Sequence, residues 1–72
     1  MGELLLKRSE ELLSQRELQI VDSLLYGATA HEVGRELNLS FHTVRTHIRN
    51  IYSKLGICNR IELARWKLSQ PR

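Results

Sequence analysis

The sequence contains one cysteine among its 72 residues, and this scarcity excludes several kinds of small protein. Cys58 cannot form an internal disulfide, and it offers no framework for a cysteine-based zinc site. His42 and His47 are five residues apart, so they would not share one face of a helix. We therefore expect no metal and no cofactor, and a reducing, intracellular setting.

Long apolar runs and catalytic motifs are also missing. No apolar stretch approaches the roughly 18 residues that a membrane-spanning helix needs. Polar residues follow directly after Leu4, Leu5 and Leu6, which argues against a secretory signal. The sequence has no glycine-rich phosphate loop, nucleophile elbow or pair of carboxylates at catalytic spacing. The sequence therefore predicts neither an enzyme nor a membrane protein. We expect a cytoplasmic location.

Acidic side chains are scarce in the second half of the chain. The formal net charge is only +3, but residues 1–36 carry seven acidic and four basic side chains. Residues 37–72 carry one acidic and seven basic side chains. Such asymmetry in a small chain favours a polyanion as the partner of the second half.

The first helical segment begins with a capping box. Ser14 and Glu17 have the Ser-x-x-Glu spacing in which each residue bonds the backbone of the other. Apolar residues then recur at helical spacing over residues 20–25. Gly27 is the predicted stop, because glycine readily adopts the left-handed conformation that ends helices.

A second, shorter helical segment follows at once. Thr29 and Glu32 form another capping box, and apolar residues follow over 33–37. Asn38 is the predicted stop because it tolerates positive φ. Leu39 is then expected to be the buried residue of a tight turn.

Two further helical segments complete the chain. Ser40 is the expected cap of the third and Gly56 its stop, after which Ile57 should pack into the core. Asn59 and Glu62 open the fourth, which runs to about residue 68. Strand-like alternation is absent, so we predict an all-α fold of four helices. Residues 1–12 are a lead-in, 13–68 the domain and 69–72 a tail.

The third helix has one apolar face and one polar face without acids. On a wheel of about 100° per residue, the apolar side chains occupy one arc that must face the core. They are Phe41, Val44, Ile48, Ile51, Tyr52 and Leu55. The opposite arc carries His42, Arg45, Thr46, Arg49, Asn50 and Ser53, flanked by Thr43 and Lys54, with His47 at the border of the apolar stripe.

This polar face carries the residue types that read DNA. The guanidinium fork of arginine matches guanine O6 and N7, and threonine can contact a base edge. Arg45 and Arg49 are one turn apart, so both can enter one groove. The hydroxyls of Ser40 and Thr43 suit phosphate oxygens, as do the free amides at the helix start. The alternative is an ordinary solvated face, but such faces usually mix acids with bases.

A short helix, a tight turn and a longer helix with a basic outer face form the plan of a helix-turn-helix. The longer helix, chiefly residues 44–55, would read the major groove. Thr29 begins the supporting helix and is a candidate phosphate contact, with His31 and Arg35 as weaker ones.

Four segments resemble the LuxR/GerE-type DNA-binding domain over residues 13–68 without a gap. They are Leu13-Ser14-Gln15-Arg16-Glu17, Gly27-Ala28-Thr29-Ala30-His31-Glu32-Val33, Leu39 to Ile57 with its run Thr43-Val44-Arg45-Thr46-His47-Ile48 and its step Lys54-Leu55-Gly56, and Asn59-Arg60-Ile61-Glu62-Leu63-Ala64. Gln15 stands where the family often has proline, and Phe41-His42 stands where it often has a charged pair.

The resemblance implies a compact tetrahelical helix-turn-helix domain, like the output modules of many bacterial response regulators. It implies sequence-specific binding of double-stranded DNA as a homodimer in transcription regulation, with RNA polymerase as a further candidate partner. The implied base-reading residues are Arg45, Thr46 and Arg49. The implied backbone contacts are Thr29, Ser40, Thr43, Asn50 and Lys54, with His42 as an additional DNA contact. The implied dimer surface comprises Cys58, Ile61, Arg65 and Trp66.

Two other functions stay open on the sequence alone. A protein-interaction module could keep the fold without binding DNA, but acids or large apolar residues would then be expected on the recognition face. A nonspecific DNA binder would show a steep salt dependence and little site preference. We further expect Cys58 to be buried or half-buried, and Trp66 to pack in the core or at the dimer contact.

Overall fold

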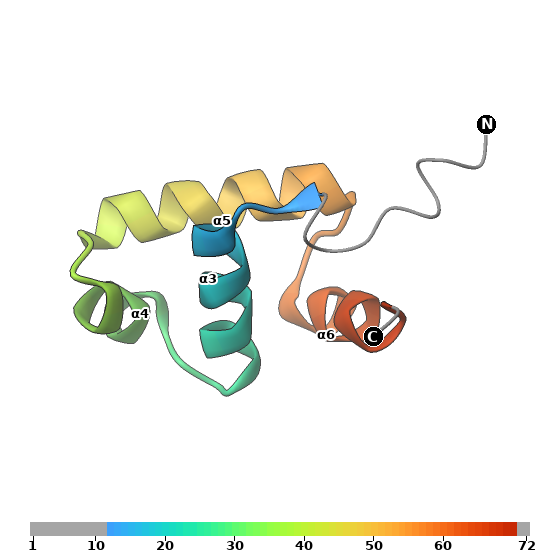
Figure 1. The fold of residues 1–72 in the computed structure, drawn as a ribbon, viewed down its shortest axis with the longest axis horizontal. Coiled ribbons are helices and arrows are strands. Elements are labelled where there is room, and N and C mark those ends of the chain that lie inside the picture. The colour runs from blue at the N-terminus through green and yellow to red at the C-terminus, as the bar shows by residue number, and fades with distance from the viewer. Residues whose placement is uncertain (1–11, 71–72) are drawn as a thin grey trace.

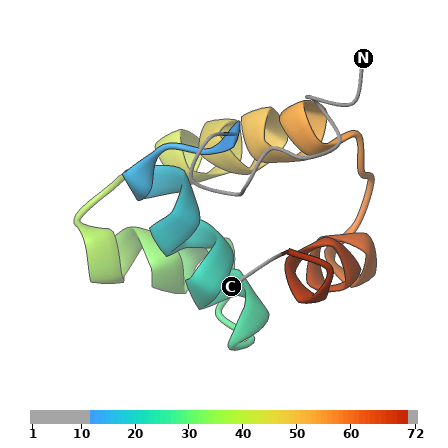
Figure 2. The ribbon, with the colours of Figure 1, turned by 45° about the vertical axis from the view of Figure 1, so that its right-hand side comes forward.

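The computed structural model describes residues 12–70, which form four α-helices. Their order is α3 (Gln15–Leu25), α4 (Ala30–Leu37), α5 (Phe41–Leu55) and α6 (Arg60–Leu68). In Figure 1, α5 crosses the top of the molecule and α3 descends from it, with α4 and α6 on either side. The turned view in Figure 2 keeps α3 between these two helices, and α3 contacts all three of the others. No strand occurs in residues 12–70, so the predicted all-α, four-helix fold is confirmed.

Helices α3 and α4 begin as the sequence predicted. The Glu17 amide donates to Ser14 Oγ at 3.1 Å, and the Ser14 amide donates to Glu17 Oε1 at 2.8 Å. Thr29 and Glu32 repeat this reciprocal pair with the same two distances. Each box satisfies amides that have no partner inside the helix, which fixes where the two helices begin.

Helices α5 and α6 also begin at the predicted caps. The Thr43 amide donates to Ser40 Oγ at 3.1 Å, and the Glu62 amide donates to Asn59 Oδ1 at 2.9 Å. At α6 the return bond comes from one residue earlier, because the Cys58 amide donates to Glu62 Oε1 at 2.6 Å.

Left-handed residues end two of the helices. Asn38 caps α4 with φ 58°, and Gly56 caps α5 with φ 67°. Gly27 follows the cap of α3 with φ 96°. All three predicted stops therefore lie where the chain leaves a helix in the conformation that glycine and asparagine tolerate best.

All four helices contribute to one core. Its buried side chains are Leu13, Ile20, Val21, Leu24, Val33, Val44, Ile51 and Leu63. Leu39 and Ile57 pack against this core but are half-buried, so the expectation of a buried Leu39 is met only in part. Across residues 12–70, no helix is both long and apolar enough to cross a membrane.

The turn between α4 and α5 is closely packed on Gly34. A Cβ atom at this position would lie 2.7 Å from the carbonyl oxygen of Leu39 and 3.6 Å from Val44 Cγ2. The Leu39 amide in turn donates to the Gly34 carbonyl at 2.8 Å. The absence of a side chain at Gly34 therefore lets the turn fold back onto α4 and sets how α5 leaves it.

Candidate nucleic-acid interface

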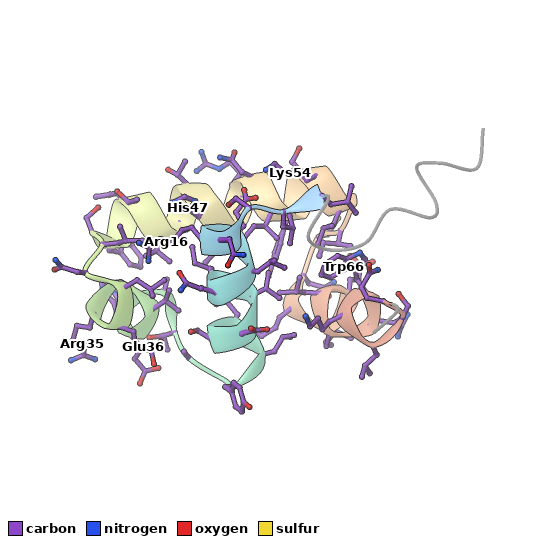
Figure 3. All side chains as sticks on the ribbon, viewed as in Figure 1. Arg16, Arg35, Glu36, His47, Lys54 and Trp66 are labelled. Atoms are coloured by element: carbon purple, nitrogen blue, oxygen red, sulfur yellow. The ribbon has the colours of Figure 1, made fainter. Side chains whose placement is uncertain are left out.

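The outer face of α5 is exposed and carries the predicted DNA-reading residues. Val44 and Ile51 are fully buried and anchor the opposite face to the core. Figure 3 shows polar side chains projecting from α5 away from α3. The exposed residues of α5 are His42, Thr43, Arg45, Thr46, Arg49, Asn50, Ser53 and Lys54. None of them is acidic, so the face can approach a phosphate backbone without repulsion from its own helix.

Hydroxyl groups lie at the starts of both α4 and α5. Ser40 Oγ and Thr43 Oγ1 are hydrogen-bonded at 2.8 Å on the exposed first turn of α5. Thr29 is exposed at the start of α4. His31 stacks on Phe41, which places the first turns of the two helices side by side. The predicted backbone contacts at Thr29, Ser40 and Thr43 are thus gathered into one region.

Lys54 differs from the other predicted DNA contacts because its charge is already held in an ion pair. Its Nζ donates to Glu17 Oε1 at 2.8 Å and to Oε2 at 3.0 Å, joining α5 to the start of α3. The Glu17 side chain is only 6% exposed, whereas that of Lys54 is 46% exposed. One ammonium hydrogen therefore remains for a phosphate, and the pair carries no net charge.

The surroundings of Glu17 favour its ionised form. Burial raises the pKa of this carboxyl, but the hydrogen bond from Lys54, the Ser14 amide and the charge of Lys54 outweigh burial and lower the pKa below its ordinary value. Glu17 thus serves two purposes, closing the capping box of α3 and holding Lys54.

The α6 region departs from the sequence prediction in the burial of one of its four dimer candidates. Cys58 is exposed, so the expectation of a buried or half-buried thiol is wrong; the turn after Gly56 carries it outward while Ile57 packs inward. Trp66 is half-buried and packs against the core, which agrees with its predicted packing but leaves less of it for a partner. Ile61 is 72% exposed, and Arg65 is also exposed.

Three features of the candidate site and of α6 were not predicted from the sequence. Leu68, 87% exposed, lies two turns from Ile61 on the same face of α6. The Glu17–Lys54 pair and the His31–Phe41 stack join residues on different helices. The spacing of Ile61, Arg65 and Leu68 could have indicated the first, but the other two depend on how helices pack.

In residues 12–70, no group of three or more histidine, cysteine, aspartate or glutamate side chains comes together.

Comparison with known proteins places the chain among regulators. A family described as "Bacterial regulatory proteins, luxR family" matches residues 11–67. The transcriptional regulatory protein LiaR of Bacillus subtilis is 44% identical over 54 residues, covering 75% of this chain and 26% of LiaR. The transcriptional regulatory protein UhpA of Escherichia coli is 41% identical over 56 residues, covering 78% of this chain and 29% of UhpA.

A third relative is the probable csgAB operon transcriptional regulatory protein of Salmonella typhimurium. It is 38% identical over 55 residues, covering 76% of this chain and 26% of the relative. The chain thus spans about a quarter of the length of these relatives. No solved structure matches significantly.

Proposed function

The chain belongs to the luxR family of bacterial regulatory proteins, and on this premise we propose that it binds specific sequences of double-stranded DNA as a homodimer. The resemblance to the LuxR/GerE-type domain that the sequence indicated is confirmed by the family match. Family membership supports DNA binding in transcription regulation, and it identifies the domain as a regulator and not an enzyme. In the proposal, α5 enters the major groove while α4 supports it across the backbone.

The observation that carries this proposal is the acid-free outer face of α5. Arg45, Thr46 and Arg49 are exposed on a helix that Val44 and Ile51, both fully buried, anchor to the core. An ordinary helix surface would mix acids with bases, and a surface repurposed for proteins would expose acids or large apolar groups. A rigidly anchored basic face without either suits a groove lined by phosphates.

The exposed side chains divide into two proposed roles. Arg45, Thr46 and Arg49 read base edges, since forked guanidinium groups and threonine can discriminate bases in the major groove. Thr29, Ser40, Thr43, Asn50 and Lys54 contact phosphates, with His42 as an additional contact. Phosphate contacts fix the register and much of the affinity, while base contacts give the preference.

The proposed dimer contact lies on α6. Ile61, Arg65 and Leu68 share one exposed face, and burying the two aliphatic side chains against a second copy would remove apolar area from water. Cys58 lies at the start of the same region and Trp66 supports it from the core side. Two copies would then present two reading helices to half-sites about one helical turn apart.

The cellular location and a further protein partner belong to the same proposal. A cytoplasmic location and contact with RNA polymerase at promoters remain predictions of the family resemblance.

Selection of binding sites from random duplexes, repeated at two salt concentrations, tests the proposal. We expect a two-fold-related consensus and binding that is much tighter to it than to random DNA. Arg49→Ala should blur one position of each half-site. Lys67→Ala removes one positive charge from α6, where Lys67 lies 3.9 Å from Asp22, and should leave the consensus unchanged.

Two outcomes would contradict the proposal in different ways. Salt-dependent binding without any consensus would identify a nonspecific DNA binder. No binding to any duplex, with no chemical-shift change on the outer face of α5 at low salt, would instead indicate an interaction module that does not use DNA.

A further inference from the structure

Phe41, the first residue of α5, lies between a histidine of the supporting helix and an arginine of the reading face. Its ring stacks on His31 of α4 with centroids 4.0 Å apart and an interplanar angle of 11°. The guanidinium carbon of Arg45 lies 5.7 Å from the centre of the same ring. Phe41 is half-buried, whereas His31 and Arg45 are exposed.

Core packing does not account for this arrangement. The partly buried hydrophobic residues that pack against the core include Ile48, Tyr52 and Leu55 of α5, but not Phe41. The polar neighbours of the ring are instead His31, Arg45 and His42, whose ring meets it edge-on with centroids 5.9 Å apart. Phe41 is therefore placed to act on the surface of the recognition region.

The Phe41 ring gives Arg45 a preferred position. Because the ring stacks flat on His31, it has a neighbour from α4 as well as its place on α5. A guanidinium within about 6 Å of an aromatic centre is attracted by the ring, and its planar shape suits such a contact. Since Arg45 follows Phe41 by four residues, the two side chains are neighbours on the helix surface, and this attraction favours one conformation of the arginine.

From this geometry we infer that Phe41 and His31 are positioning residues that determine the base preference of Arg45. The inference rests on the proposed function. An exposed arginine loses rotamer freedom when it bonds a base, and presetting it lowers that cost. A preset fork also distinguishes bases better than a freely moving one, because it reaches two acceptors only at a defined position, such as O6 and N7 of guanine.

The first test uses the free protein and no DNA. Ring currents of Phe41 should shift the NMR signals of the Arg45 side-chain protons relative to those of Arg49, which lies over no aromatic ring within residues 12–70. Phe41→Leu should abolish the shift and Phe41→Tyr should keep it. Equal shifts for Arg45 in the wild type and in Phe41→Leu would overturn the contact between Arg45 and the Phe41 ring.

The second test measures base discrimination on duplexes of the selected consensus. Arg45→Ala first identifies the base pair that Arg45 reads. Phe41→Leu should then reduce discrimination at that base pair about two- to fivefold, the size expected for an exposed cation–π contact. His31→Ala should reduce discrimination at the same base pair, and Phe41→Tyr should preserve it.

A second pair of measurements separates this role from a merely structural one. If Phe41 acts through Arg45, Phe41→Leu should leave discrimination at the base pair read by Arg49 unchanged, and it should add nothing in an Arg45→Ala background. Undiminished discrimination at the Arg45 base pair, or equal losses at every position, would overturn the inference. Ring-current shifts with no site preference in the wild type would instead show that the proposed function has failed.

Discussion

Arg49 and Lys54 lie on the same helix, but replacing them should change DNA binding in different ways. Arg49 is exposed, whereas Lys54 is bonded to Glu17. We expect Arg49→Ala to cost about 1–3 kcal/mol on the preferred site and to relax one base position. Lys54→Ala should weaken binding to preferred and random duplexes alike and reduce the salt slope by about 1. Titrations of both duplexes at several salt concentrations would measure this, and equal losses for both variants on both duplexes would contradict the division of roles.

Lys54 should also matter to folding. Lys54→Ala leaves the nearly buried carboxylate of Glu17 without its counter-charge. We expect a loss of about 1–3 kcal/mol in the free energy of unfolding, measured with urea. Arg49→Ala is the matched control and should change stability by no more than about 0.5 kcal/mol. Unchanged stability in Lys54→Ala would mean that the ion pair contributes nothing net.

Glu17 should also make stability depend on acid pH. Its pKa is lowered in the folded chain, so the unfolded state binds the proton more readily. The stability that it contributes is therefore fully present above its ordinary pKa of about 4.5 and is lost as pH falls through the lower folded value. Glu17→Gln should flatten this part of the curve of unfolding free energy against pH, and an unaltered curve would show that the pair does not persist in solution.

At the scale of elements, Gly34 makes the turn between α4 and α5 intolerant of a side chain. Alanine would gain up to about 1 kcal/mol in helix propensity, but its Cβ would lie 2.7 Å from the backbone oxygen of Leu39. Because backbone cannot move aside as a flexible side chain can, the overpacking cost of about 1–3 kcal/mol should exceed the gain.

Thermal unfolding checks this expectation. Gly34→Ala should have a lower Tm than the wild type, and Arg35→Ala, at the next and exposed position of α4, should not. A Gly34→Ala variant that is more stable than the wild type would show that the turn can shift without cost.

The helices themselves were largely predictable from the sequence, whereas the contacts between them were not. Ser14, Thr29, Ser40 and Asn59 all cap helices as expected, because capping acts over about four residues and is written in local sequence. The Glu17–Lys54 pair spans 37 residues and depends on the angle at which α3 meets α5. The exposure of Cys58 was not predicted for a different reason: the residue lies in the turn after α5, and no periodic pattern indicates which way a turn residue points.

At the scale of the whole molecule, the exposed face of α6 predicts cooperative binding. Leu68→Glu would place a carboxylate in the proposed dimer contact, so affinity for a duplex with two half-sites should fall while affinity for a single half-site should not. Tyr26→Glu is a matched control, because Tyr26 is 94% exposed but follows α3. Gel-shift titrations of the two duplexes would measure both, and equal losses for Leu68→Glu on both duplexes would argue against a dimer through α6.

The unequal exposure of Glu17 and Lys54 also bears on which substitutions relatives of this chain can accept. A lysine at position 54 remains solvated when position 17 loses its acid, so that change can come first. An acid at position 17 has no such freedom, because it would be left without a counter-ion in a place that water hardly reaches. Substitution of Glu17 should therefore precede substitution of Lys54. Related sequences that keep the lysine without the glutamate should be far commoner than sequences that keep the glutamate without the lysine.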